Sequence, residues 1–112
     1  MDLTAATTQE IVDELAKREV VKGVNEKRFA LIKQAVEAEF RKTSGKFPAF
    51  NSGHEGFAVL KEEVDELWEA VKLNQQRHPE RDDLMLKEGI RVAAMGLRFL
   101  HDVAFKNRGR LE

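Results

Sequence analysis

The stretch HEGFAVLKEEVDELWEAVK, residues 54–72, decides both the fold and the chemistry expected of this chain. Its apolar residues recur at steps of three and four, which is the period of one face of an α-helix. This stripe consists of Phe57, Leu60, Val64, Leu67 and Val71, and Trp68 widens it. Six acidic residues lie between Glu55 and Glu69, with Lys61 as the single lysine among them. The stretch therefore predicts an amphipathic helix with a dense group of carboxylates on one rod.

The start of this helix is marked by Ser52 and Glu55, which have the Ser-x-x-Glu spacing of a capping box. Before it, residues 43–53 hold two glycines, two serines and Pro48, a composition typical of a loop. We therefore expect a loop over residues 43–53 and the acidic helix over residues 53–76.

The same periodicity extends to both ends of the chain. Residues 8–42 are expected to form an N-terminal helical region, broken or bent near Gly23 and Asn25. Residues 82–107 are expected to form a C-terminal apolar helix, whose centre, VAAMGL, is apolar on all sides. Gly89 and Gly96 leave room on it for another helix, so we expect this helix to contact a second subunit.

Composition limits the class of protein. A length of 112 residues suits a single domain, and the patterns above make it an all-α bundle of about four helices over residues 1–112. The net charge of −1 offers no basic field for nucleic acid, so no nucleic-acid partner is expected. The chain has no cysteine, no segment resembling a signal peptide and no long apolar run. These features predict a cytoplasmic location and no membrane contact.

The acidic group fits a site for a hard metal ion. Glu62 and Glu66 are four residues apart and Glu63 and Glu66 are three apart, so their carboxylates share one patch of a helix. Mg²⁺ prefers a few carboxylates and keeps water or phosphate oxygens as its other ligands. We therefore predict that Glu62, Glu63 and Glu66 bind Mg²⁺, or alternatively Mn²⁺. The alternative is a solvated acidic face.

The same residues carry a resemblance to a known family. The segment EEVDE resembles the Glu-Glu-x-x-Glu motif of the MazG-like all-α nucleotide pyrophosphohydrolases, and KEGIRVAAM follows where that family has Glu-x-x-Asp. The resemblance covers residues 52–102 and places Glu88 at the glutamate of the second motif. It implies Mg²⁺-dependent hydrolysis of a nucleoside triphosphate to a monophosphate and pyrophosphate. It also implies a homo-oligomeric helical bundle, a dimer or a tetramer.

One position departs from the family pattern. Arg91 stands where the family has its aspartate, and a guanidinium cannot ligate a cation. It could contact a substrate phosphate or pair with a glutamate. Asp102 lies 14 residues after Glu88, about 21 Å along one helix, so within one subunit it cannot share a metal ion with Glu88.

We assign the site roles accordingly. Glu62, Glu63, Glu66 and Glu88 are the predicted metal ligands, and Glu63 is also the predicted catalytic base. Arg91 and Phe50 are the predicted substrate-binding residues. The competing hypothesis is a non-catalytic all-α interaction protein that keeps the MazG-like fold with a degenerate metal site, and Arg91 is the feature that favours it.

Overall fold

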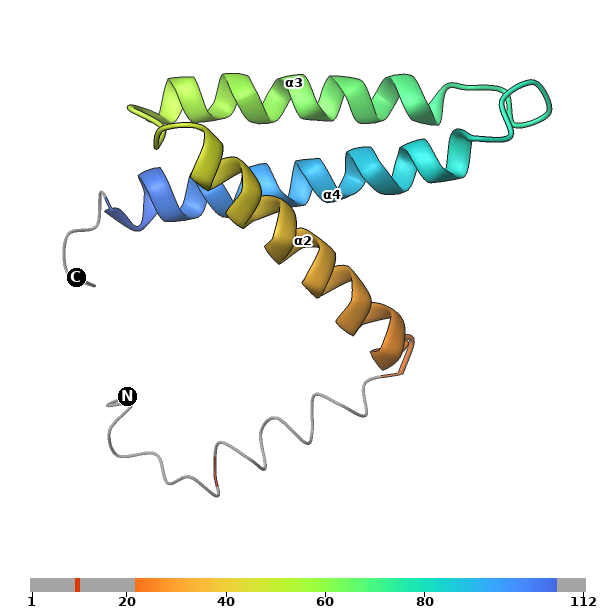
Figure 1. The fold of residues 1–112 in the computed structure, drawn as a ribbon, viewed down its shortest axis with the longest axis horizontal. Coiled ribbons are helices and arrows are strands. Elements are labelled where there is room, and N and C mark those ends of the chain that lie inside the picture. Colours follow the sequence, from red (N-terminus) through yellow and green to blue (C-terminus); the bar gives the residue numbers. More distant parts are fainter. Residues whose placement is uncertain (1–9, 11–21, 107–112) are drawn as a thin grey trace. The chain divides into compact units, whose positions relative to one another are not determined.

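The regular elements are all helical in the part of the chain that the structure describes. This structure is a computed structural model that describes residue 10 and residues 22–106. It contains the α-helices α2 (Glu26–Lys46), α3 (Gly53–Val71) and α4 (Arg81–Phe99), and the short π-helix η2 (Leu100–Ala104), with no strand in these residues (Figure 1). The predicted all-α class is confirmed for this part. The helix expected before Gly23 lies outside the described residues, apart from residue 10, and a count of four helices stays a prediction.

The chain divides into two compact units, residues 1–31 and residues 32–112. In the first unit, Gly23 has a φ of +87°, a conformation open to glycine because it has no Cβ. The side-chain Oδ1 of Asn25 then accepts a 2.9 Å hydrogen bond from the backbone N–H of Arg28 and caps the start of α2. The division falls inside α2, and the single domain expected over residues 1–112 stays a prediction.

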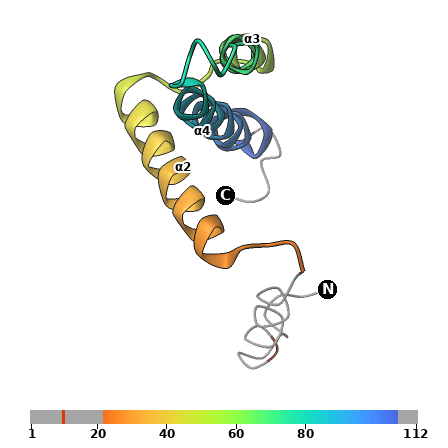
Figure 2. The same ribbon diagram turned by 90° about the vertical axis from the view of Figure 1, so that its right-hand side faces the viewer.

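The centre of the second unit is an antiparallel pair of helices. α3 and α4 lie side by side along their length (Figures 1 and 2). The main cluster of buried apolar side chains comes from the loop before α3, from α4 and from η2, and residues of α2, α3 and α4 pack against it. The buried set is Phe50, Ala94, Met95 and Val103, and the residues packed on it are Val36, Phe40, Val59, Leu60 and Phe99. The Glu63 side chain of α3 lines a cavity together with the core residues Phe50 and Met95.

The start of α3 follows the sequence prediction in part. Ser52 is the N-cap, and its side-chain oxygen accepts a 3.1 Å hydrogen bond from the backbone N–H of Glu55. The Glu55 carboxylate does not return to Ser52. It accepts hydrogen bonds from the backbone and side-chain N–H groups of Asn51, at 3.3 and 3.1 Å. The helix start is thus fixed by a bond pattern one residue wider than a standard capping box.

The other boundaries differ from the sequence prediction by several residues. α2 continues to Lys46, beyond the predicted end of the helical region at residue 42, so the predicted loop over residues 43–53 begins too early. The hydroxyl of Thr43 donates a 3.0 Å hydrogen bond to the carbonyl of Glu39, a bond that threonine can form within a helix. α3 ends at Val71, and Leu73 bonds to the carbonyl of Ala70, a tightened last turn that precludes the predicted end at residue 76.

The C-terminal helix is not uniform. It begins at Arg81, one residue before the predicted start, with Glu80 at the N-cap position and no side-chain cap. It changes to the π-helix η2 at Leu100, where the Phe105 N–H bonds to the Leu100 carbonyl at 2.9 Å. The predicted single helix over residues 82–107 is therefore an α-helix followed by one wider turn.

The loop between α2 and α3 is held by two buried charged residues. Arg98 donates a 2.8 Å hydrogen bond from Nη2 to the carbonyl of Pro48, and its guanidinium lies 4.4 Å from the centre of the Phe50 ring. The Asp102 carboxylate accepts a 3.2 Å bond from the Phe50 N–H and lies 3.7 Å from Arg98. Both charged side chains are less than 10% exposed. Arg98 and Asp102 thus hold this loop at the end of the helix pair where α3 begins and α4 ends.

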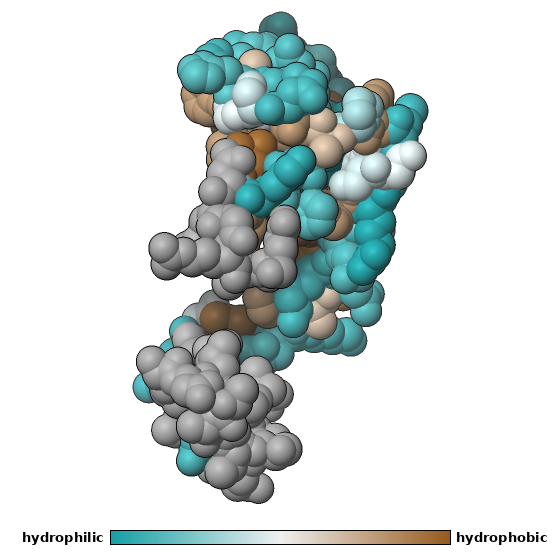
Figure 3. Space-filling model, turned by 90° about the vertical axis from the view of Figure 1, so that its left-hand side faces the viewer, coloured by the Kyte–Doolittle hydropathy of each residue, from teal (hydrophilic) through white to brown (hydrophobic). Residues whose placement is uncertain are grey.

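Large apolar side chains remain at the surface of the second unit. Phe57 is 60% exposed and Trp68 is 56% exposed, so these two residues of the apolar stripe on α3 are left uncovered. The reason is that α4 covers only one side of α3, and the apolar stripe of α3 is wider than that side. Hydrophobic residues reach the surface among hydrophilic ones on the face drawn in Figure 3. No helix among the described residues has both the length and the apolar character needed to span a membrane.

Candidate metal centre

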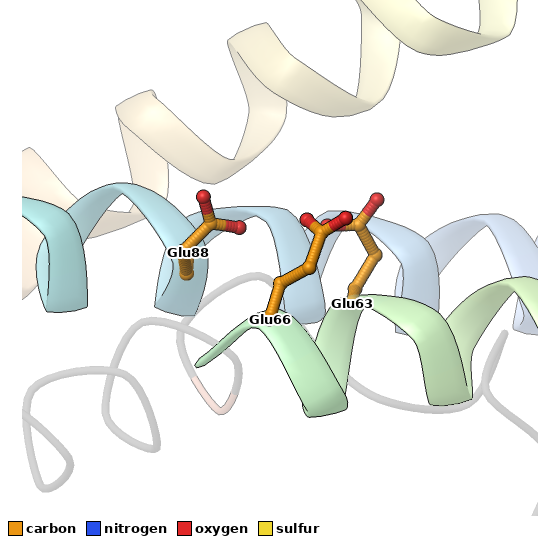
Figure 4. A group of neighbouring side chains, drawn as sticks. All are labelled: Glu63, Glu66 and Glu88. Atoms are coloured by element: carbon orange, nitrogen blue, oxygen red, sulfur yellow. The ribbon is translucent and has the colours of Figure 1, made fainter. Parts of the chain in front are cut away.

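Three glutamates meet between α3 and α4. Glu63 and Glu66 project from α3 and Glu88 projects from α4, with their carboxylates on the same side of the helix pair (Figure 4). One oxygen from each lies within 4.8 Å of the other two. The spacing of three on α3 brings the first two together, and the antiparallel pairing of α3 with α4 adds the third. We call these three residues the carboxylate cluster.

Two oxygens of the cluster are buried without a partner. The Oε2 atoms of Glu63 and Glu88 are inaccessible to solvent and form no hydrogen bond. The Glu88 side chain is only 12% exposed. Buried polar atoms are nearly always paired in folded proteins, because an unpaired one loses its water without replacement. Unpaired acceptors facing other carboxylates are the arrangement that a cation would satisfy.

Arg91 supplies the neighbouring positive charge. Its Nη1 donates to Oε1 of Glu88 at 3.2 Å, one turn along α4, and its side chain is 35% exposed. Of the two alternatives that the sequence leaves open, pairing with a glutamate is therefore observed. With three ionised carboxylates and one guanidinium, the formal charge of the site is −3 + 1 = −2. One divalent cation would neutralise it.

The pKa of Glu63 is raised above its ordinary value of 4.5. Burial is the largest cause, because it penalises the charged form. The charges of Glu66 and Glu88 raise the pKa further, as does a hydrogen bond with Glu66, while Arg91 opposes them. A carboxylate with a raised pKa is a stronger base once ionised, which suits a proton acceptor in a reaction.

The cluster fits a small divalent cation in ligand type and roughly in size. Mg²⁺ binds oxygens at about 2.0–2.1 Å, so opposite ligands lie roughly 4 Å apart. Adjacent ligands of such an ion lie roughly 3 Å apart, so the cluster oxygens, which lie within 4.8 Å of one another, would move closer together around one ion. All three ligands are oxygens, which favours Mg²⁺ or Mn²⁺ over softer metals.

The remaining predicted site residues are placed as follows. Glu62 is exposed and does not belong to the cluster, although it is next to Glu63 in the chain. Phe50 is only 7% exposed and packs in the core, with one edge lining a cavity that Glu63 also lines. Phe47, which is 51% exposed, lines the same cavity and offers more surface to a ligand.

Sequence patterns alone missed the cationic residues around the cluster. Arg98 lines the cavity beside Glu63, and its buried Nε has no hydrogen-bond partner. Lys42 and Lys46 line a second cavity that Glu63 and Arg91 share. Arg98 and Asp102 carry opposite charges and are four residues apart in an apolar segment. This spacing is the one sequence feature that could have indicated a buried ion pair.

Comparison with known proteins adds no relative: no family model, no curated protein and no solved structure matches the chain. The carboxylate cluster, the cavities beside it and the motif resemblance are therefore the features from which a function can be inferred.

Proposed function

We propose that this chain is a Mg²⁺-dependent nucleoside triphosphate pyrophosphohydrolase, which hydrolyses a nucleoside triphosphate to a monophosphate and pyrophosphate. The observation that carries the proposal is the convergence of Glu63, Glu66 and Glu88, with two of their oxygens buried and unpaired. The MazG-like motif resemblance of α3 supports the reaction type. Mg²⁺ held by carboxylates commonly takes phosphate oxygens of a substrate as further ligands, which suits a nucleoside triphosphate.

Each residue of the carboxylate cluster, and Arg91 beside it, has a role in this reaction. Glu66 and Glu88 would hold Mg²⁺ together with Glu63, and Arg91 fixes the orientation of the Glu88 carboxylate through their 3.2 Å contact. Bound Mg²⁺ would screen the phosphate charges and lower the pKa of a nearby water molecule. Glu63 would accept the proton of the water that attacks the α-phosphorus, and pyrophosphate would leave as the bond between the α-phosphorus and its bridging oxygen breaks.

The cavity beside Glu63 supports a nucleotide as substrate. It has a volume of about 380 Å³, within the range of roughly 300–1,000 Å³ found for small-molecule sites. Its walls are mostly apolar, with charged groups at the Glu63 side and at Arg98. The lining residues are Thr43, Phe47, Pro48, Phe50, Glu55, Val59, Glu63, Met95 and Arg98. A flat heteroaromatic base suits such walls, because every base offers an apolar face.

A screen for pyrophosphate release tests the proposal. The full chain is incubated with Mg²⁺ and each common nucleoside triphosphate and deoxynucleoside triphosphate, and pyrophosphate and monophosphate are quantified separately. At least one nucleotide is expected to give equal amounts of both products. Glu63→Gln is expected to lower kcat by about 10²-fold or more, the usual contribution of a general base.

A matched control separates the site from the rest of the acidic helix. Glu69 lies on the same helix, pairs with Lys72 at 2.8 Å and is outside the cluster. Glu69→Gln removes the same charge and is expected to keep the activity of the parent. Equal loss in both variants, or release of single phosphates in place of pyrophosphate, would contradict the assigned reaction.

A second function is favoured by one observation. The ion pair between Arg91 and Glu88 partly neutralises the cluster without any metal ion, as expected if the site had become structural. On this hypothesis the chain is a non-catalytic interaction protein with the same fold. It predicts no Mg²⁺ binding and no pyrophosphate release from any nucleotide, while the oligomer remains.

We also propose that the chain forms a homo-oligomer, a dimer or a tetramer. Phe57, Val64 and Trp68 are exposed and recur at steps of seven and four, so they share one side of α3. Exposed apolar stripes of this kind usually mark interfaces. Sedimentation is expected to show an oligomer at micromolar concentration, and Trp68→Glu is expected to shift it towards monomer. A monomeric parent would contradict the proposal.

A further inference from the structure

A second, smaller cavity lies next to the apolar one and shares Thr43, Phe47, Glu63 and Met95 with it. It has a volume of about 200 Å³ and is lined by residues of α2, α3 and α4 and of the loop after α2. Its lining is unusually rich in charge for its size. The residues are Glu39, Lys42, Thr43, Lys46, Phe47, Glu63, Arg91 and Met95. Three cations and two carboxylates therefore surround a space that opens beside the carboxylate cluster.

Within residues 22–106, the two lysines of this cavity form no salt bridge. Lys42 and Lys46 are exposed, and the Nζ atom of Lys46 lies 5.5 Å from the centre of the Phe47 ring. They are four residues apart on α2, so both ammonium groups reach the same side of that helix. On the opposite side of the cavity, Arg91 donates one N–H to Glu88 and keeps its other N–H donors.

A phosphate chain beside a metal ion requires carboxylates around the ion and cationic side chains around the phosphates. Carboxylates repel phosphate, so they can hold it only through a cation. Ammonium and guanidinium groups bind phosphate oxygens directly with charge-assisted hydrogen bonds. The small volume suits a phosphate chain better than a whole nucleotide, since pockets for larger ligands start at roughly 300 Å³.

We propose that Lys42, Lys46 and Arg91 form a subsite for the phosphate chain of the substrate, in the cavity that borders the apolar one at Glu63. The inference rests on the proposed function, because it assigns the phosphate end of the same substrate. In this arrangement the apolar cavity takes the base and the cationic cavity takes the terminal phosphates. Glu63, which lines both, lies where the bond between them is cut.

The subsite is tested with inorganic pyrophosphate and no nucleoside. Calorimetry on the full chain with Mg²⁺ in excess measures the Kd of pyrophosphate for the parent and for Lys42→Gln combined with Lys46→Gln. The double variant is expected to raise this Kd at least tenfold. Lys46→Arg, which keeps the charge, is expected to stay within about threefold of the parent.

The matched control is Lys27→Gln combined with Lys106→Gln, which removes two positive charges from exposed residues outside both cavities. It is expected to leave the pyrophosphate Kd unchanged, so a general effect of net charge would be visible. Because both lysines are exposed, their replacement is not expected to unfold the chain, and circular dichroism checks this.

The failures of the two proposals are distinguishable. Pyrophosphate binding that depends on the lysines, in a chain that hydrolyses no nucleotide, would overturn the proposed function and keep the subsite. Hydrolysis with an unchanged KM and an unchanged pyrophosphate Kd in the double variant would overturn the subsite alone. A parent chain that does not bind pyrophosphate would also overturn the subsite.

Discussion

Gly56 is the residue at which the packing of the second unit can be tested most sharply. A Cβ added there would lie 2.8 Å from Cδ2 of Phe99 and 3.0 Å from Cδ2 of Phe50. Carbon atoms pack at about 3.5–4.0 Å, so Gly56→Ala forces both rings to move by several tenths of an ångström. Phe50 resists this movement because Arg98 stacks on its ring and Asp102 binds its N–H.

The expected cost follows from these two contacts. Overpacking of a core costs about 1–3 kcal/mol, and two obstructed rings place Gly56→Ala near the upper end. Alanine recovers up to about 1 kcal/mol through its better helix propensity. The free energy of unfolding should therefore fall by about 2 kcal/mol, which corresponds to a Tm lower by about 8 °C or more in a chain of this size.

Chemical denaturation followed by circular dichroism, at one protein concentration, measures the effect. Gly45→Ala is the matched control, because Gly45 is also helical and nothing lies within 4 Å of its added Cβ. That variant is expected to be as stable as the parent or more stable. If Gly56→Ala were as stable as Gly45→Ala, the packing of α3 against Phe50 and Phe99 would be wrong.

Three further results are expected. The pKa of Glu63 is raised, so the folded chain favours its protonated form. The free energy of unfolding of the metal-free chain should therefore fall as the pH rises from about 4.5 through that raised pKa. Thermal melts across the pH range should show this loss in the parent and not in Glu63→Gln. Arg91→Asp adds a carboxylate one turn from Glu88 and should tighten Mg²⁺ binding in calorimetry; unchanged affinity would place Arg91 outside the site. Asp102→Ala leaves the buried Arg98 charge without its partner and should cost about 3–5 kcal/mol in denaturant unfolding, whereas a loss under about 1 kcal/mol would contradict the buried pair.

The helices and the start of the acidic helix were predictable from local patterns. Steps of three and four define an amphipathic helix whatever it packs against, and Ser52 with Glu55 marks its first turn by spacing alone. The pairing of Glu63 with Glu66 followed from the same geometry. Glu88 was reached through the motif resemblance, and α4 does bring it to the other two glutamates.

The choice between Glu62 and Glu63 was not predictable from the sequence. Glu62 and Glu66 have a spacing of four and Glu63 and Glu66 a spacing of three, and both spacings bring side chains together on a helix. Only the position of α4 decides which side of α3 faces a partner. That position depends on contacts distant in the chain, such as those of Gly56 with Phe99.

The buried charges were missed for a related reason. Arg98 and Asp102 lie in a helix with many apolar residues, where charged residues are usually assigned to the solvated side. Their burial depends on the loop after α2, which supplies the Pro48 carbonyl and the Phe50 N–H as partners. A pattern within one helix carries no information on groups that come from another segment.

The most direct test of the metal centre is the effect of Mg²⁺ on the free energy of unfolding. A cation that binds only the folded chain stabilises it by RT ln(1 + [L]/Kd), about 2.7 kcal/mol at a hundredfold excess over Kd. The parent and Glu62→Gln are expected to show this gain, and Glu66→Gln combined with Glu88→Gln is expected to lose it. An equal response in all three chains, or no response in the parent, would contradict the assignment of Glu63, Glu66 and Glu88 as metal ligands.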